Sequence, residues 1–254
     1  MKTNATKQRS GQILIVTTLI ISLVLLSTQL YIIEVSKAFV ETESSHVNSF
    51  VSAIRLGSKH IVTGSLANIT MGGSNSILLT NLAKWKNLTS NMFQLGKAIL
   101  NFSPKNATPY TKGVYLSWGV TGFGISSAYV DFNFSLSDQK VAVQTQYNIN
   151  VTTSITQEAE YRILQGDSKQ VNVTCNVFNE GSPALAENVT ICYDYMGIWY
   201  RADTQGVYNF LDYGNGTYSI SFEANIPGSP VKVQAFIDDL RGISVRAVTT
   251  CIES

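Results

Sequence analysis

The longest apolar run of the chain lies near its N-terminus. Residues 13–33 contain no charged side chain, and the basic residues Lys2, Lys7 and Arg9 precede them. At 1.5 Å rise per residue, a helix over this run matches the ~30 Å hydrocarbon core of a bilayer. Basic residues before the run and Glu34 after it predict that the N-terminus stays in the cytoplasm. The run therefore predicts a cell-membrane protein with a single-pass signal anchor that binds the lipid bilayer and an extracellular C-terminal part.

Two other interpretations of this run stay open. A cleaved secretory signal peptide has an apolar region of ~7–15 residues and a small-x-small cleavage site, which this longer run lacks. The start of the run, with Arg9, Gly11 and Gln12, resembles archaeal type IV pilin-like and Tad-type pilus proteins. That resemblance implies a leader cleaved between Gly11 and Gln12. Many of these proteins carry Glu five residues into the mature chain, where this chain has Val16.

A helical period continues after the apolar run. Apolar residues recur every seven positions at Val40, Val47, Ile54 and Ile61, which places them along one face of a helix. This stripe packs either on the protein's own domain or on neighbouring copies. After a Gly-rich break, the apolar spacing predicts a second helix over 76–100.

Beyond this point the period changes to two. Apolar and polar residues alternate over 129–136, 141–155 and 171–177, which is typical of strands with one buried face. The dipeptide Asn215-Gly216 predicts a hairpin turn. About seven short strands with regular turn signals predict a β-sandwich from residue 157 onward.

The C-terminal motifs carry a second resemblance. The stretches "EGSPALAENVTICYDYM", "DYGNGTYSISFEA" and "VQAFIDDLRG" are similar to the immunoglobulin-like modules of prokaryotic surface proteins and invasin-type adhesins. The resemblance covers about residues 160–254. It implies a sandwich that serves as a spacer or adhesive unit and has no general catalytic residues.

These patterns predict an α+β chain, in which a transmembrane helix extends into a stalk and a helical segment, followed by strands. The predicted parts are a cytoplasmic basic leader (1–11), a transmembrane helix (12–33), an extracellular helical stalk (34–100), a β-rich region (101–156) and an Ig-like β-sandwich (157–254).

Asparagines in N-x-S/T sequons are frequent in this chain. Nine of them follow the apolar run, so each is a potential N-glycosylation site if that part is extracellular. The nine are Asn68, Asn87, Asn101, Asn106, Asn133, Asn150, Asn172, Asn188 and Asn215.

The chain has three cysteines, so at most one intramolecular bridge can form. Strand parity places Cys175 and Cys251 on the inner face and Cys192 on the outer face. We therefore predict a Cys175–Cys251 disulfide, with Cys192 exposed as a free or intermolecular thiol.

Composition and motifs argue against catalysis and nucleic-acid binding. Charged residues make up 14 % of the chain and the net charge is +1, so no basic stripe is available for phosphates. No catalytic or nucleotide-binding motif occurs. Asp238 and Asp239 stand in a turn, and we interpret them as turn residues rather than Ca²⁺ ligands. We predict no catalytic, cofactor or metal site.

The predicted function is that of a membrane-anchored extracellular surface glycoprotein with a structural or adhesive role, and the resemblances point to an archaeal source. One alternative is a pilin-like filament subunit. Another is an accessory subunit of a membrane enzyme or transporter. Its partners would be other copies of the chain or membrane proteins.

Overall fold

The structure is a computed structural model of the 254-residue chain. It describes residues 22, 25–32, 47–93, 96–137, 142–204 and 206–254. The chain divides into two compact units, Met1–Arg55 and Leu56–Ser254.

The predicted α+β class is wrong, because strands hold 54 % of the described residues and helices only 25 %. The predicted helix over 76–100 ends earlier, since α2 spans Ile77–Met92 and strand β1 begins at Lys97. In β1 the side chains of Ala98 and Leu100 are buried while Asn101 is exposed. Pairing with a neighbouring strand decides the conformation of this short apolar segment.

The predicted transmembrane helix is also contradicted. Within the described residues, no helix combines the length and the apolar character needed to cross a membrane. The described helical positions of the run are 22 and 25–32, and eight residues rise only ~12 Å. The other residues of 13–33 lie outside the described residues. The single-pass location, with the N-terminus cytoplasmic and the C-terminal part extracellular, was inferred from this span and is contradicted with it.

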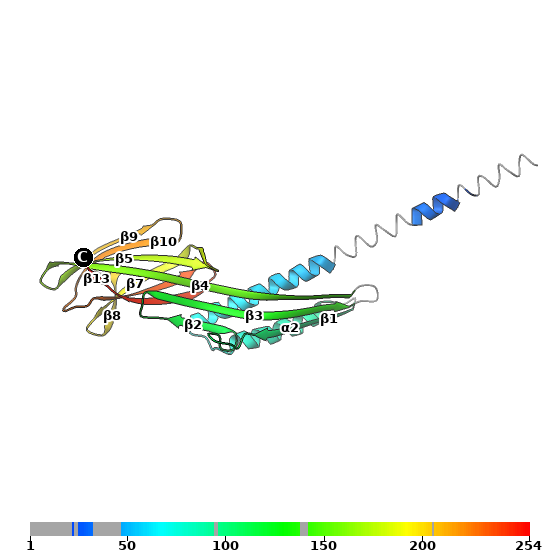
Figure 1. The fold of residues 1–254 in the computed structure, drawn as a ribbon, viewed down its shortest axis with the longest axis horizontal. Coiled ribbons are helices and arrows are strands. Elements are labelled where there is room, and N and C mark those ends of the chain that lie inside the picture. The colour runs from blue at the N-terminus through cyan, green and yellow to red at the C-terminus, as the bar shows by residue number, and fades with distance from the viewer. Residues whose placement is uncertain (1–21, 23–24, 33–46, 94–95, 138–141, 205) are drawn as a thin grey trace, which may run out of the picture. The chain divides into compact units, whose positions relative to one another are not determined.

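The strands form two sheets (Figure 1). The larger sheet has the order β1 (Lys97–Pro104), β3 (Phe123–Ser137), β4 (Ala142–Gln165), β5 (Ser168–Asn179), β10 (Thr217–Asn225) and β9 (Val207–Asp212). Three short strands join it: β2 (Val114–Trp118) beside β3, β6 (Ser182–Pro183) beside β5, and β13 (Ile252–Glu253) parallel to β4. The smaller sheet has the order β12 (Ser244–Thr250), β11 (Lys232–Asp239), β7 (Ala186–Tyr195) and β8 (Ile198–Arg201). The 3₁₀ helix η1 (Ala202–Thr204) connects β8 to β9.

The two sheets pack face to face and enclose the main core. The predicted alternation over 171–177 is confirmed, because its odd-numbered residues are buried in this core and its even-numbered residues are not. Val233, Ala235 and Ile237 of β11 contribute from the smaller sheet, and Tyr218 and Phe222 are the largest buried side chains of β10. Each such side chain contributes ~1.5–3 kcal/mol by leaving water.

Two helices provide a second core, which is built on β1, β3 and β4. One helix covers residues 47–70 and the other is α2, and Leu66, Leu78 and Leu82 are fully buried between helices and sheet. Trp85 Nε1 donates a hydrogen bond to Ser58 Oγ at 3.0 Å, and Ser58 Oγ lies 3.0 Å from Tyr147 Oη on β4. The helices are thereby fixed to the larger sheet.

Strand β4 is common to both cores. Its 24 residues pair with β3 along the first part and with β5 along the second. The strand runs without interruption through position 156, where a β-rich region was predicted to give way to a sandwich. Residues 101–156 and 157–254 therefore share one strand.

Candidate binding surface

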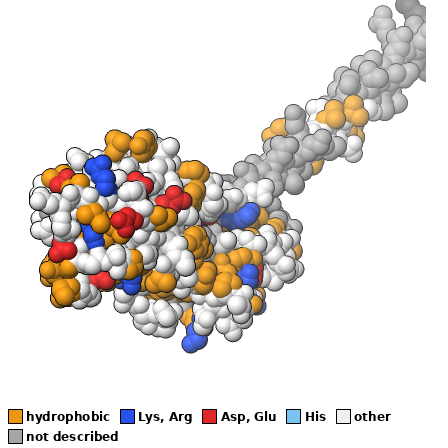
Figure 2. Space-filling model, turned by 60° about the vertical axis from the view of Figure 1, so that its left-hand side comes forward, with side chains coloured by type: hydrophobic (Ala, Val, Ile, Leu, Met, Phe, Trp, Pro, Cys, Tyr) orange, Lys and Arg blue, Asp and Glu red, His pale blue; other side chains and the backbone are white. Residues whose placement is uncertain are grey.

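Large apolar side chains are exposed on the outermost strand of each sheet. Between Tyr195 and Tyr213, nine of them have exposed fractions of 37–81 %. We call this set the apolar edge: Tyr195, Met196, Ile198, Trp199, Tyr200, Val207, Phe210, Leu211 and Tyr213. Figure 2 shows hydrophobic side chains at the surface in patches separated by charged residues. Exposed apolar patches are often interaction sites.

The hairpin between β7 and β8 presents the first part of the apolar edge. Its two-residue turn consists of Met196 (φ 54°) and Gly197 (φ 87°), and two left-handed residues are what a type I′ hairpin turn requires. Asp194 Oδ1 accepts a hydrogen bond of 2.7 Å from Gly197 N. The turn therefore holds Met196 at the tip, where it is 81 % exposed.

Aromatic packing keeps the side chains of this hairpin in place. The ring of Tyr200 stacks on Tyr193 with centroids 6.1 Å apart and meets Tyr195 edge-on at 5.9 Å. Tyr193 in turn contacts the core residue Phe222 at 5.7 Å. The exposed aromatic surface is thus anchored in the sandwich core and is preorganised for contact with a partner.

Strand β9 presents the second part of the apolar edge. It is the last strand of the larger sheet, and within the described part of the chain it pairs with β10 alone. The ring of Phe210 lies 5.9 Å from that of the buried Tyr218. Val207 and Leu211 lie on the opposite face of the strand and are 45 % and 53 % exposed.

Charge is scarce around the apolar edge. Residues 195–213 contain three charged side chains, Arg201, Asp203 and Asp212. Arg201 pairs with Asp203 at 2.5 Å, and this hydrogen bond lowers the pKa of the Asp203 carboxyl. The pair is solvent-exposed, so its stabilising effect is small. The surface therefore suits an apolar protein partner better than a charged one.

All nine predicted glycosylation sites lie in the described part of the chain, and none is buried. Eight are exposed and Asn133 is intermediate. Asn101, Asn133, Asn150 and Asn172 project from the outer face of the larger sheet, where Asn101 and Asn133 face each other on paired strands. These two line a shallow groove of about 460 Å³. The positions allow attachment of glycans, which stays a prediction.

All three cysteines are free thiols and are buried. Cys175 and Cys251 both belong to the sandwich core, as predicted from parity, but the predicted bridge between them is not formed. Burial raises the pKa of Cys175 and that of Cys251 to about 12. Cys192 lies on the other face of β7 and is only 8 % exposed. Its neighbour across the strand pair is Arg201 of β8, and both residues line a groove on this face.

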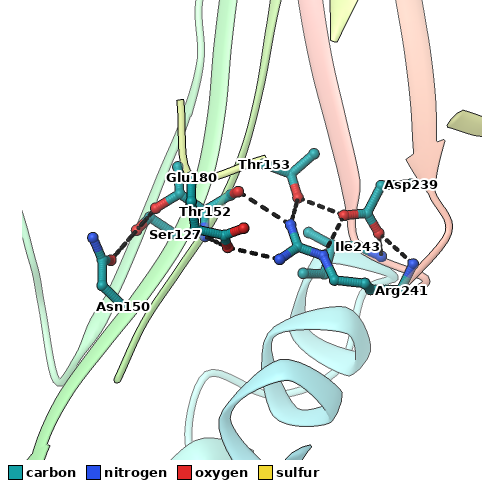
Figure 3. Close-up of polar contacts among 8 residues, drawn as sticks. All are labelled: Ser127, Asn150, Thr152, Thr153, Glu180, Asp239, Arg241 and Ile243. Atoms are coloured by element: carbon teal, nitrogen blue, oxygen red, sulfur yellow. Dashed lines mark hydrogen bonds and ion pairs between the residues drawn. The ribbon is translucent and has the colours of Figure 1, made fainter. Parts of the chain in front are cut away.

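The acidic turn between β11 and β12 has a structural role (Figure 3). Asp239 is fully buried, and its Oδ2 accepts hydrogen bonds from Arg241 Nε and Thr153 Oγ1, both at 2.8 Å. Its Oδ1 accepts from the backbone N–H groups of Arg241 and Ile243. Both carboxylate oxygens of Asp239 are thus satisfied by groups of the protein itself.

Arg241 connects this turn to the larger sheet. Its guanidinium donates to Glu180 Oε1 at 2.6 Å, to the carbonyl oxygen of Thr152 at 3.1 Å and to Thr153 Oγ1 at 2.9 Å. Nothing in the sequence indicated this network, because Glu180 and Arg241 are 61 residues apart.

Prediction from the sequence also missed the apolar edge. Its signal in the sequence was the pair of segments "YMGIWY" and "VYNFLD", which are too apolar for exposed strands.

The predicted leader cleavage site at Gly11 and Gln12 lies outside the described residues.

No protein-family model matches the chain, and no curated protein or solved structure matches it either. The resemblances to pilin-like starts and to immunoglobulin-like modules therefore stay predictions.

Proposed function

We propose that this protein is a non-catalytic structural or adhesive protein that acts by binding protein surfaces through its apolar edge. The proposal rests on nine exposed apolar side chains, six on the outermost strands β8 and β9 and three on residues directly beside these strands. Burying such surface supplies the main free energy of protein association. Aromatic residues held by core packing are typical anchors in binding interfaces.

Site-specific photo-crosslinking tests this proposal. A benzophenone amino acid in place of Met196, introduced into the full chain in its native cells, should yield crosslinked protein adducts on irradiation. The matched control carries the same group at Thr174, which is exposed on the polar face of β5. No adducts at Met196, or equal adducts at both positions, would overturn the proposal.

The same experiment separates the two alternative functions. A filament subunit should crosslink to a ladder of its own copies, whereas an accessory subunit should crosslink to one different protein. A structural or adhesive protein of the kind proposed gives adducts with several different proteins and no such ladder.

A further inference from the structure

The outermost strands of the two sheets differ in how their free edges are protected. Proteins usually protect an edge with charge, proline, shortness or a covering element. Strand β1 begins with Lys97, ends with Pro104 and contacts α2. Strand β12 lies against β3 and β4, and β8 has four residues and ends at Arg201. Residues 207–211 of β9 contain no charge and no proline, and their pairing with β10 has no bulge.

The direction of the backbone groups along β9 follows from one hydrogen bond at its end. Tyr213 N donates to Thr217 O at 3.1 Å, so the backbone of Tyr213 faces β10. Backbone groups alternate in direction along an antiparallel strand. Asn209 therefore also faces β10, and the N–H and C=O groups of Tyr208 and Phe210 point away from the sheet. Among the described residues, no further strand pairs with this side of β9.

We propose that β9 pairs antiparallel with β9 of a second copy of this chain, about a two-fold axis at Asn209. In this register Tyr208 exchanges both backbone hydrogen bonds with Phe210 of the second copy, and symmetry repeats the exchange. Val207 faces Leu211 of the second copy on the outer face. The larger sheets of the two copies become one continuous sheet.

A second copy is the occupant because the strand is complementary to itself. The chosen register places an aliphatic side chain opposite an aliphatic one, an aromatic ring opposite an aromatic ring, and Asn209 opposite Asn209 of the second copy. Such cross-strand pairs stabilise sheets. The alternation of backbone groups also allows a two-fold axis at Tyr208 or at Phe210, but these registers are less complementary. An axis at Tyr208 sets the aliphatic Val207 opposite the polar Asn209, and an axis at Phe210 brings the charged Asp212 into the pairing. A two-fold interface requires a self-complementary patch, and residues 207–211 provide one.

This inference rests on the proposed function, because it names a second copy as the partner for one part of the apolar edge. The β8 hairpin takes no part in the pairing. Variants in β8 therefore serve as controls, and crosslinking at Met196 reports on the proposed function independently.

A cysteine at the two-fold axis gives a direct test. Asn209 and its symmetry mate form a non-hydrogen-bonded pair with Cα atoms ~4.5 Å apart, which is within the range for a disulfide. Full-length Asn209→Cys should form a covalent dimer under mild oxidation, since the three native cysteines are buried. Ser219→Cys, on the same face of the neighbouring β10, should not. A monomeric Asn209→Cys, or equal dimer from both variants, would overturn the pairing.

Charge substitutions test the register without relying on oxidation. Leu211→Asp should weaken association of the full chain in sedimentation equilibrium by about tenfold, because the aliphatic contact with Val207 of the second copy is lost on both sides of the axis. Adding Val207→Lys should restore it, since the introduced amine faces the introduced carboxylate of the other copy. Ile198→Asp on β8 should leave association unchanged. Failure of the double variant to recover would exclude the axis at Asn209.

The two hypotheses fail in different ways. A wild-type chain that is monomeric at all concentrations, but still crosslinks to another protein through Met196, would overturn the pairing and keep the proposed function. Dimerisation without adducts at Met196 would keep the pairing and overturn the proposed function.

Discussion

Two arginine–aspartate pairs in this molecule are close in geometry but differ in their surroundings. Arg241 and Asp239 are 2.8 Å apart and the aspartate is fully buried, whereas Arg201 and Asp203 are 2.5 Å apart at the surface. A buried carboxylate that loses its cation keeps its desolvation cost, whereas an exposed one is hydrated again.

Replacing each arginine by leucine should separate these two cases. We expect Arg241→Leu to lower the free energy of unfolding by about 3 kcal/mol, and Arg201→Leu to have a much smaller effect because its ion pair is exposed to solvent. Urea denaturation of both variants measures the difference. Equal losses would show that the Asp239 network does not hold the β11–β12 turn to β4.

The core thiols provide a second prediction for single residues. Because burial raises the pKa of Cys175 and Cys251 to about 12, both should stay unreactive to a thiol reagent at pH 8 and react only on unfolding. Unfolded cysteines ionise near their ordinary pKa of 9.0. The stabilisation from these thiols is therefore complete below pH 9 and is lost as the pH rises from 9 towards 12. Fast labelling of either thiol in the native protein would contradict this burial.

Two glycines of the helix over residues 47–70 have opposite environments. A Cβ atom at Gly57 would overlap the ring of Trp85 on α2, whereas one at Gly64 would meet no atom within 4 Å. Gly57 thus allows the two helices to approach closely, and Gly64 only lowers the helix propensity.

Alanine at these positions should therefore have effects of opposite sign. Gly64→Ala is expected to raise the free energy of unfolding by up to about 1 kcal/mol. Gly57→Ala should lower it by about 1–3 kcal/mol, because Trp85 must move and its hydrogen bond to Ser58 is disturbed. Thermal unfolding of the two variants compares them directly. A stabilising Gly57→Ala would mean that the helices are further apart.

Individual strands could be predicted where one face is buried and the other is polar, as in residues 171–177. The segment from Lys97 to Leu100 could not, since a short apolar run suits a helix or a strand until its neighbour is known. The apolar edge escaped prediction for a related reason. "VYNFLD" reads as an ordinary strand, and only the order of strands in the sheet shows that one side of it has no neighbour.

For the whole molecule, association through β9 should respond weakly to salt. Residues 207–211 contain no charged side chain, and screening acts only on charges. Sedimentation equilibrium of the full chain in 0.05 M and in about 1 M salt should give dissociation constants within about threefold of each other. A steep loss of affinity with salt would indicate that charged residues outside β9 make the contact.

The arrangement of the whole molecule was the hardest feature to predict from the sequence. The run over 13–33 has the composition of a membrane span, but the described helices do not include one. The boundary placed at position 156 relied on the short strands and regular turn signals that follow it, and these carry no information on whether a strand stops there. Only strand pairing shows that β4 continues.

The continuity of β4 has a mechanical consequence. A tensile load applied along this strand is carried by its ladders with β3 and β5 together, so many backbone hydrogen bonds resist it in shear instead of opening one after another. The helix-covered end and the sandwich cannot bend about a linker, because no linker lies between them. The unit from Leu56 to Ser254 should therefore transmit force as a stiff element, a property that suits a structural protein under tension.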